Sequence, residues 1–176
     1  MTSWHQDEQL RQVLERKAVL FDTDFLSDVV KNQEQFQEFL YLIADAHATP
    51  MITELVRGEF LGGVHDETLR DARDKFLKEL KVDPLHLNPL DKHVDDAVDV
   101  INDLCRHKER DRLGLIDAIH IALLKKYKTN LVLVTRNLRD FPTSILRRDT
   151  VFAVDLGGRQ EVYAYGLYSW RGRSAQ

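Results

Sequence analysis

Cysteine, proline and glycine are scarce in this chain of 176 residues, which has one, four and eight of them. The single cysteine, Cys105, excludes an internal disulfide and a cysteine-rich zinc site and is typical of a protein from a reducing compartment. No apolar run approaches the ~18 residues of a membrane span, and the first residues lack the apolar stretch of a signal peptide. We therefore expect a cytoplasmic protein without a membrane partner.

An excess of positive charge is also lacking. The chain has 25 Lys and Arg residues against 29 Asp and Glu residues, a formal net charge of -4 at pH 7. This balance argues against a protein that holds nucleic acid through a broad basic surface. Any contact with a polyanion must therefore be local, through an arginine cluster or through a metal ion that bridges carboxylate and phosphate.

The length and the share of hydrophobic residues, 43%, predict one globular domain over residues 1–176. We expect a core at about 18–154, an N-terminal arm at 1–16 that is a polar helix or a loose segment, and a C-terminal extension at 155–176. In the extension, 162–165 and 167–170 favour β structure and suggest an intramolecular hairpin.

Apolar periodicity predicts short strands that alternate with helices. Strands are expected at 19–21, 49–53, 85–87, 131–135 and 150–154, and helices at 24–31, 33–47, from 54 to near 62, 66–80, 91–108 and 116–128. Strands separated by helices indicate the α/β class, with a mainly parallel central sheet covered by helices on both faces.

Three acidic residues follow predicted strands. Asp22 comes directly after the first strand, Glu54 after the second, and Asp140 lies in the loop after 131–135. Parallel sheets bind ligands outside the carboxyl ends of their strands, so these side chains are expected at one edge. Each acid alone also suits an ordinary helix start or turn, and Asp24 is expected to cap the helix that follows it.

A fourth acid, Asp117, interrupts the most apolar predicted helix. A lone buried carboxylate costs several kcal/mol unless it is paired, protonated or bound to a metal. Four acids in one crevice would repel one another, and a divalent cation would remove that conflict. Oxygen ligands favour Mg²⁺ or Mn²⁺, so the joint placement predicts a metal site. His120, one turn away, is expected to be a satisfied core histidine.

Four segments, in this order, resemble the PIN-domain proteins, and most of all the VapC-type toxins of prokaryotic toxin–antitoxin systems. They are Val19-Leu20-Phe21-Asp22-Thr23, Ile52-Thr53-Glu54-Leu55-Val56-Arg57-Gly58, Asp117-Ala118-Ile119-His120-Ile121-Ala122 and Val134-Thr135-Arg136-Asn137-Leu138-Arg139-Asp140-Phe141. The resemblance implies a three-layer α/β/α sandwich and a Mg²⁺- or Mn²⁺-dependent ribonuclease. It implies that Asp22, Glu54, Asp117 and Asp140 are the catalytic, metal-binding acids, with Thr135 and Asn137 as supporting polar residues.

The hypothesis that follows is hydrolysis of an RNA phosphodiester by water that a metal site activates. No Ser, Cys or His arrangement suggests a covalent intermediate. Arg57, Arg136 and Arg139 are candidates for holding RNA phosphates, and ordinary surface solubility explains the last two equally well. The resemblance also implies an antitoxin protein and a homodimer as partners.

Two alternatives stay open. Asp22-Thr23-Asp24 after an apolar strand also resembles a haloacid dehalogenase-type phosphatase, with Asp22 as nucleophile and Asp24 as acid. Against it, Leu26 stands where Thr or Val is expected, and no late pair of aspartates follows. The other alternative is a non-catalytic PIN-fold binding module whose acids are structural or bind a partner's arginines.

Overall fold

One mixed sheet runs through the molecule, of which the computed structural model describes residues 4–80, 83–85, 93–106, 114–139, 141–156 and 162–171. The strands are β1 (Ala18–Phe21), β2 (Thr49–Thr53), β3 (Asp83–Leu85), β4 (Leu131–Thr135), β5 (Leu146–Asp155) and β6 (Val162–Trp170), in the order β3-β2-β1-β4-β6-β5. The pairs β1–β2, β1–β4 and β2–β3 are parallel, and β6 runs antiparallel to both of its neighbours.

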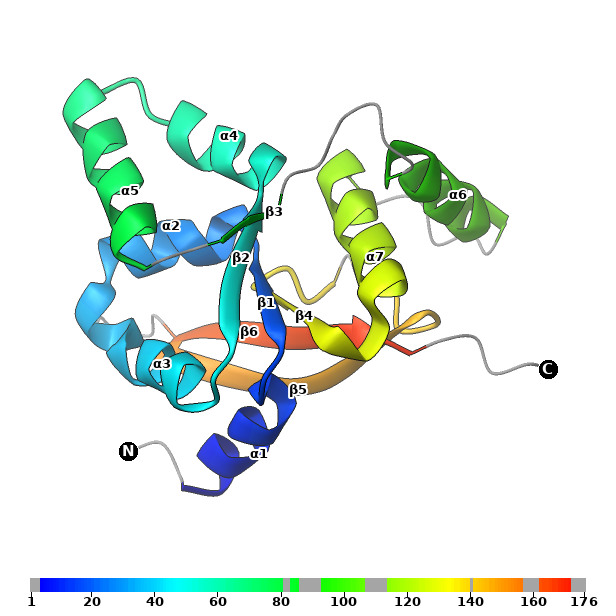
Figure 1. Cartoon of the computed structure of the whole chain (residues 1–176), viewed down its shortest axis with the longest axis horizontal. Helices are drawn as coiled ribbons and strands as arrows, with labels where there is room; N and C mark the ends of the chain where they lie inside the picture. The colour runs from blue at the N-terminus through cyan, green and yellow to red at the C-terminus, as the bar shows by residue number, and fades with distance from the viewer. Residues whose placement is uncertain are drawn as a thin grey trace.

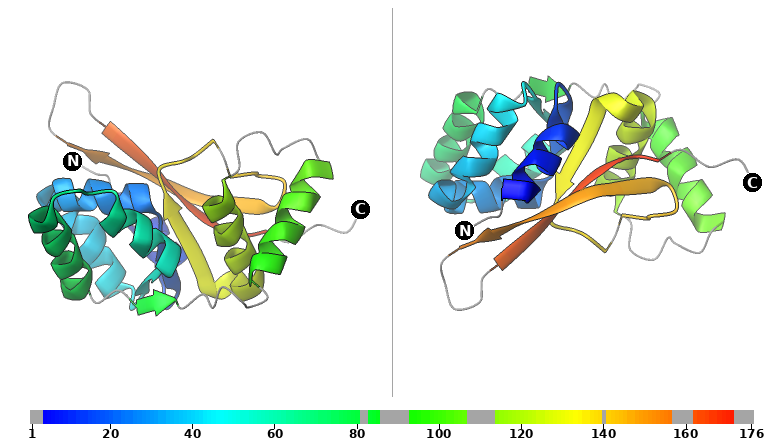
Figure 2. Two further views of the ribbon diagram at one scale, coloured as in Figure 1. Left: turned by 90° about the horizontal axis from the view of Figure 1, so that it is seen from above. Right: turned by 90° about the horizontal axis from the view of Figure 1, so that it is seen from below.

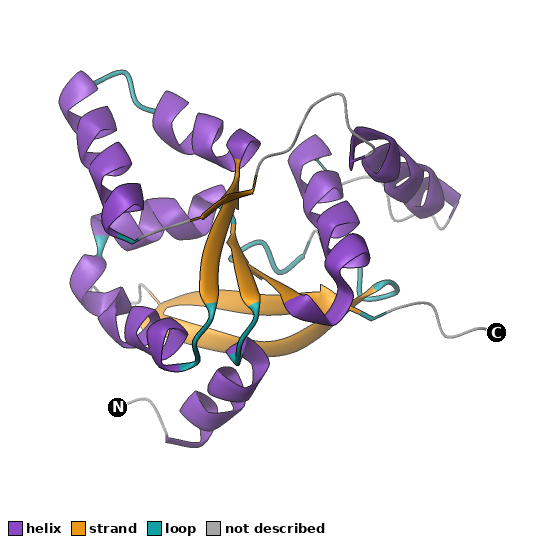
Figure 3. Ribbon diagram, viewed as in Figure 1, coloured by secondary structure: helices purple, strands orange, loops and turns teal. Residues whose placement is uncertain are grey.

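Helices cover both faces of this sheet (Figures 1 and 3). They are α1 (Trp4–Leu14), α2 (Thr23–Lys31), α3 (Gln33–Asp45), α4 (Glu54–Gly62), α5 (Glu67–Glu79), α6 (His93–Arg106) and α7 (Leu115–Tyr127), followed by a short 3-10 helix, Lys128–Asn130. Helices α2 to α5 lie on one side of the strands, and α6 and α7 lie on the other. In the described ranges, none of these helices is long and apolar enough to cross a membrane.

The alternation of side chains along the strands divides the interior into two cores. Val19 and Phe21 of β1 pack with the α1–α5 side, whereas Leu20 packs with α6 and α7. In β4, Val132 and Val134 face the first core, and Leu131 and Leu133 face the second. Because both faces of β1 and β4 are buried, these two strands are almost entirely apolar. The helices on both faces of the sheet confirm the expected three-layer α/β/α sandwich.

Most expected elements are present, with shifts at their ends. Strands 49–53 and 131–135 have the predicted bounds. The third strand lies at Asp83–Leu85, earlier than the expected 85–87, of which 86 and 87 are outside the described residues. The N-terminal segment is a helix that packs on the first core through the buried Leu10 and Leu14.

The segment 162–170 differs from the two short hairpin pieces expected there. It forms one strand, β6, which lies alongside β5 for its whole length and also pairs with β4 (Figure 2). Tyr165 and Leu167 are buried in the first core and Tyr168 in the second. A strand that buries both faces can occupy the interior of a sheet, and this is why β6 separates β4 from β5.

Gly166 of β6 gives room for the loop that follows β4. A Cβ atom at this position would lie 2.6 Å from Tyr168 Cε2 and 2.8 Å from Leu138 Cδ2. We predict that Gly166→Ala lowers the free energy of unfolding by about 1–3 kcal/mol, because the fully buried Tyr168 ring cannot move freely. At Gly58 in α4, an added Cβ atom would have no neighbouring atom within 4 Å. Gly58→Ala should therefore raise the free energy of unfolding by about 0.5–1 kcal/mol. Urea unfolding measures both changes, and a neutral Gly166→Ala would show that Tyr168 and Leu138 can adjust.

Candidate active site

The sheet has a topological switch point between β1 and β4. From β1 the chain continues to β2 and β3 on one side, and it then returns to place β4 on the other side of β1. The two strands are parallel, with Phe21 opposite Val134, so their carboxyl ends meet at the same edge. In open α/β sheets this edge holds the ligand crevice. Asp22 and Thr135 therefore lie where the fold favours a site.

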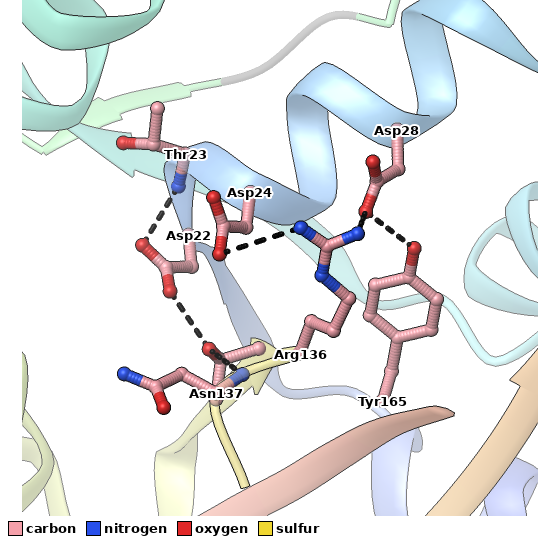
Figure 4. A network of polar contacts seen from close by, with 8 residues as sticks. Asp22, Thr23, Asp24, Asp28, Arg136, Asn137 and Tyr165 are labelled. Atoms are coloured by element: carbon pink, nitrogen blue, oxygen red, sulfur yellow. Dashed lines mark hydrogen bonds and ion pairs between the residues drawn. The ribbon is translucent and has the colours of Figure 1, made fainter. Parts of the chain in front are cut away.

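The Asp22 carboxylate is fixed by two hydrogen bonds (Figure 4). Its Oδ1 accepts from the backbone N–H of Thr23 at 2.7 Å, and its Oδ2 accepts from the Thr135 hydroxyl at 2.7 Å. The backbone N–H of Asn137 donates to Thr135 Oγ1 at 3.0 Å. Asp22 is also the N-cap of α2, so the expectation that Asp24 caps this helix is wrong. The predicted supporting residues Thr135 and Asn137 thus lie beside Asp22.

Glu59 also belongs to this edge, although the sequence did not single it out. The Thr23 hydroxyl donates to Glu59 Oε2 at 2.7 Å, which joins the start of α2 to α4. Thr23 therefore contacts Asp22 through its backbone and Glu59 through its side chain. The only sequence signal was a second acid five positions after Glu54 on the same helix.

Asp24 lies in the first turn of α2, where negative charges are close together. Partial burial raises its pKa, the Asp22 carboxylate raises it further, and the Arg136 guanidinium opposes both. The Asp28 and Glu59 carboxylates also raise the pKa of Asp24, by smaller amounts. This edge of the sheet thus carries a local excess of carboxylates, which is the charge that a bound cation would balance.

The other predicted acids are placed as follows. Glu54 is the first residue of α4, next to the end of β2, and is exposed. Asp117 lies half-buried in the first turn of α7, where its Oδ2 accepts from the backbone N–H of Gly114 at 3.2 Å. Asp140 is outside the described residues. The roles assigned to these three acids stay predictions.

The three candidate arginines have different surroundings. Arg57 of α4 pairs with Asp74 of α5 at 2.7 Å. Arg136 directly follows β4 and pairs with the buried Asp28 of α2 at 3.0 Å. Arg139 is exposed in the same loop. Among the three, Arg139 has the surroundings that best suit contact with an external phosphate.

The chemistry of these side chains fits a hard divalent cation, because the donors are carboxylate oxygens in a region of negative charge. The described residues do not, however, form a complete set of metal ligands. Within the part of the chain that the structure describes, no three Asp, Glu, His or Cys side chains are grouped so that they could hold a metal ion. The local negative charge and the carboxylate oxygen donors are therefore the features that favour a cation.

Comparison with known families agrees with this geometry. A family model described as "PIN domain" matches residues 19–142, more than half of the chain. The chain belongs to the PIN domain family. PIN domains are generally metal-dependent nucleases, and membership of the family supports a nuclease activity for this chain. Neither the curated proteins nor the solved structures gave a match.

Among the described residues of this PIN domain, His120 of α7 is a polar side chain buried in the core. Its side chain is fully buried, and neither ring nitrogen has a hydrogen-bond partner among the described residues. His120 is a core histidine, as expected, but the expected hydrogen bonds to its ring are not found among the described residues. Burial lowers its pKa, while the Asp22 and Glu59 carboxylates oppose that shift. The imidazole is therefore neutral at pH 7 and places two polar nitrogens in the core near the acidic edge.

We predict that His120→Leu raises the free energy of unfolding at pH 7 by about 1–2 kcal/mol, because it removes buried nitrogens that lack partners. The gain should grow on acidification. A lowered pKa in the folded state means that the wild type loses stability as the pH falls below about 6.5, and the leucine variant lacks this loss. Urea unfolding at several pH values measures the effect.

His120→Gln is the matched control, because it leaves polar atoms in the same place and should give no gain. A His120→Leu variant less stable than wild type by more than about 1 kcal/mol would contradict the prediction, since it would show that the imidazole has a hydrogen-bond partner.

Proposed function

We propose that this PIN domain is a Mg²⁺- or Mn²⁺-dependent ribonuclease that cuts RNA by hydrolysis of an internal phosphodiester. The observation that supports it best is the fixed carboxylate of Asp22 at the switch point, held by Thr135 and Thr23. Asp24 and Glu59 add negative charge beside it. An edge of this kind repels RNA phosphates unless a cation lies between them, so the geometry favours metal-dependent chemistry.

In this proposal Asp22 is the central metal ligand, and Glu54, Asp117 and Asp140 complete the set that the sequence motifs imply. Glu59 joins them through its contact with Thr23. When bound, the metal polarises the scissile phosphate and lowers the pKa of the attacking water. The protein contributes fixed carboxylate positions, which avoid the cost of reorganising free side chains at the moment of reaction.

Supporting residues orient both the acids and the substrate. Thr135 and Asn137 keep one oxygen of Asp22 in a hydrogen bond, so the carboxylate presents a constant face to the crevice. Arg139 binds an RNA phosphate next to the cleaved bond. Arg57 and Arg136 form ion pairs within the protein that offset their charge, so they contribute less to RNA binding than Arg139 does.

The sequence motifs also support a narrower biological role, the toxin of a toxin–antitoxin pair that acts in the cytoplasm. On this proposal an antitoxin protein inhibits the nuclease by inserting a basic side chain among the acids, and the toxin forms a homodimer. The charge excess around Asp22 and Asp24 suits such an inhibitor.

We predict that Asp22→Asn lowers RNA cleavage by at least about 100-fold, because it weakens a central ligand of a metal worth several kcal/mol to the reaction. Glu59→Gln should also lower the cleavage rate, since Glu59 accepts a hydrogen bond from Thr23 beside Asp22. A panel of structured and single-stranded RNAs, incubated with EDTA, Mg²⁺ or Mn²⁺, measures these rates. Full Mn²⁺-dependent cleavage by Asp22→Asn would refute the proposal.

The same assay separates the alternatives. Turnover of small phosphate esters through a trapped aspartyl-phosphate would indicate a haloacid dehalogenase-type phosphatase instead. Mn²⁺ binding without cleavage of any RNA would indicate a binding module. Products of neighbouring genes are added last, and cleavage that persists in the presence of each of them would contradict the toxin role.

A further inference from the structure

Strand β6 reaches the edge of the sheet where Asp22 lies, although it is outside the segment 19–142 that the PIN family model matches. Tyr163 and Tyr165 are two positions apart and so project from the same face of β6. The Tyr165 hydroxyl donates to Asp28 Oδ2 at 2.8 Å. The Arg136 guanidinium lies over the Tyr163 ring, with its Cζ atom 4.6 Å from the ring centroid. Tyr163 therefore contacts Arg136 directly, and Tyr165 contacts Asp28, the ion-pair partner of Arg136 (Figure 4 shows Tyr165).

Asp28 is a buried carboxylate in α2 that receives two donors on one oxygen. Oδ2 accepts from the Tyr165 hydroxyl and from Arg136 Nη1, which lies 3.0 Å away. Its side chain is only 8% exposed, so the negative charge depends on these partners. Burial raises the pKa of Tyr165, and Asp28 adds to that effect, so the hydroxyl stays protonated and keeps donating.

Arg136 is thus held more closely to Asp28 than to the acids near Asp22. Its Nη2 lies 3.8 Å from Asp24 Oδ2, against 3.0 Å for the Asp28 contact (Figure 4). The Arg136 side chain is about two-thirds buried, and its guanidinium lies over the Tyr163 ring. Without these restraints it would turn toward Asp24 and Asp22, where a positive charge competes with a cation for the carboxylates.

We propose that Asp28 and Tyr163 are positioning residues that restrain Arg136 and so keep the carboxylates near Asp22 available to a divalent cation. Tyr165 assists by fixing Asp28. This inference rests on the proposed function, because it requires a cation at Asp22. It also gives β6 a role in the site, since the strand supplies the aromatic surface on which Arg136 lies.

Tyr163→Leu tests the restraint without changing any charge. Isothermal titration of the full chain with Mn²⁺ should show affinity reduced about two- to fivefold, the range expected for a lost cation–π contact. Tyr163→Phe is the matched control, because it keeps the ring, and should bind as the wild type does. In an Arg136→Gln background, Tyr163→Leu should have no effect, since the side chain that it releases is absent.

Asp28→Asn tests the ion pair and should weaken Mn²⁺ binding about tenfold, as expected for loss of a hydrogen bond to a charged group. Asp45→Asn is its control, because it makes the same chemical change and breaks the Arg11–Asp45 pair on exposed surface. Thermal unfolding of each variant checks that the fold is kept. Asp22→Asn checks that the titrated site is the proposed one.

The outcomes separate the two proposals. Wild-type affinity in Tyr163→Leu, or a loss that persists with Arg136→Gln, would overturn the restraint and leave the nuclease proposal intact. A wild-type protein that binds no Mn²⁺, or binds it equally well as Asp22→Asn, would overturn the proposed metal site and this inference with it.

Discussion

The hydrogen bond between the Thr135 hydroxyl and Asp22 Oδ2 holds the candidate site together. It joins residues 113 positions apart in the sequence, at the carboxyl ends of two adjacent parallel strands. It forms because β4 returns beside β1, which brings both strand ends to one edge. The same contact orients the N-cap of α2 and, through Asn137, the loop that carries Arg136.

Charge is the constraint that the rest of the site must satisfy. Three carboxylates, those of Asp22, Asp24 and Glu59, lie at this edge, and a fourth, that of Asp28, is buried in α2. A single arginine cannot balance all of them, and the structure commits Arg136 mainly to Asp28. The remaining negative charge is compatible with the proposed divalent cation, while the net charge of -4 leaves any contact with nucleic acid to local groups.

Much of the fold could be predicted from the sequence, because local patterns encode it. The run 131–135 is wholly apolar before a polar loop, and 49–53 leads directly into a helix, so both strands were placed correctly. The pairing of β6 with β4 was not predictable in this way. It depends on contacts between distant segments, and the alternation of tyrosines in 162–170 fits an isolated hairpin equally well.

The site was predicted in part for the same reason. Asp22 directly follows β1, Thr135 ends β4 and Asn137 lies two positions further on, so their position relative to one another follows from the sheet. Glu59 lies within a helix, and its contact with Thr23 depends on how α4 packs against α2. Asp28 has a local signal in the sequence, since it lies among the apolar Phe25, Leu26 and Val29, all of which are buried. A carboxylate in such a stretch needs a partner from elsewhere, here Arg136 and Tyr165.

A crystal structure of the protein grown with Mn²⁺, in which anomalous scattering locates the metal, would show whether a cation binds at Asp22. We expect an anomalous peak at coordination distance, about 2.0–2.3 Å, from the Asp22 carboxylate and beside Glu59. A peak elsewhere on the surface, or none at saturating Mn²⁺, would contradict the claim that this edge of the sheet is a cation site.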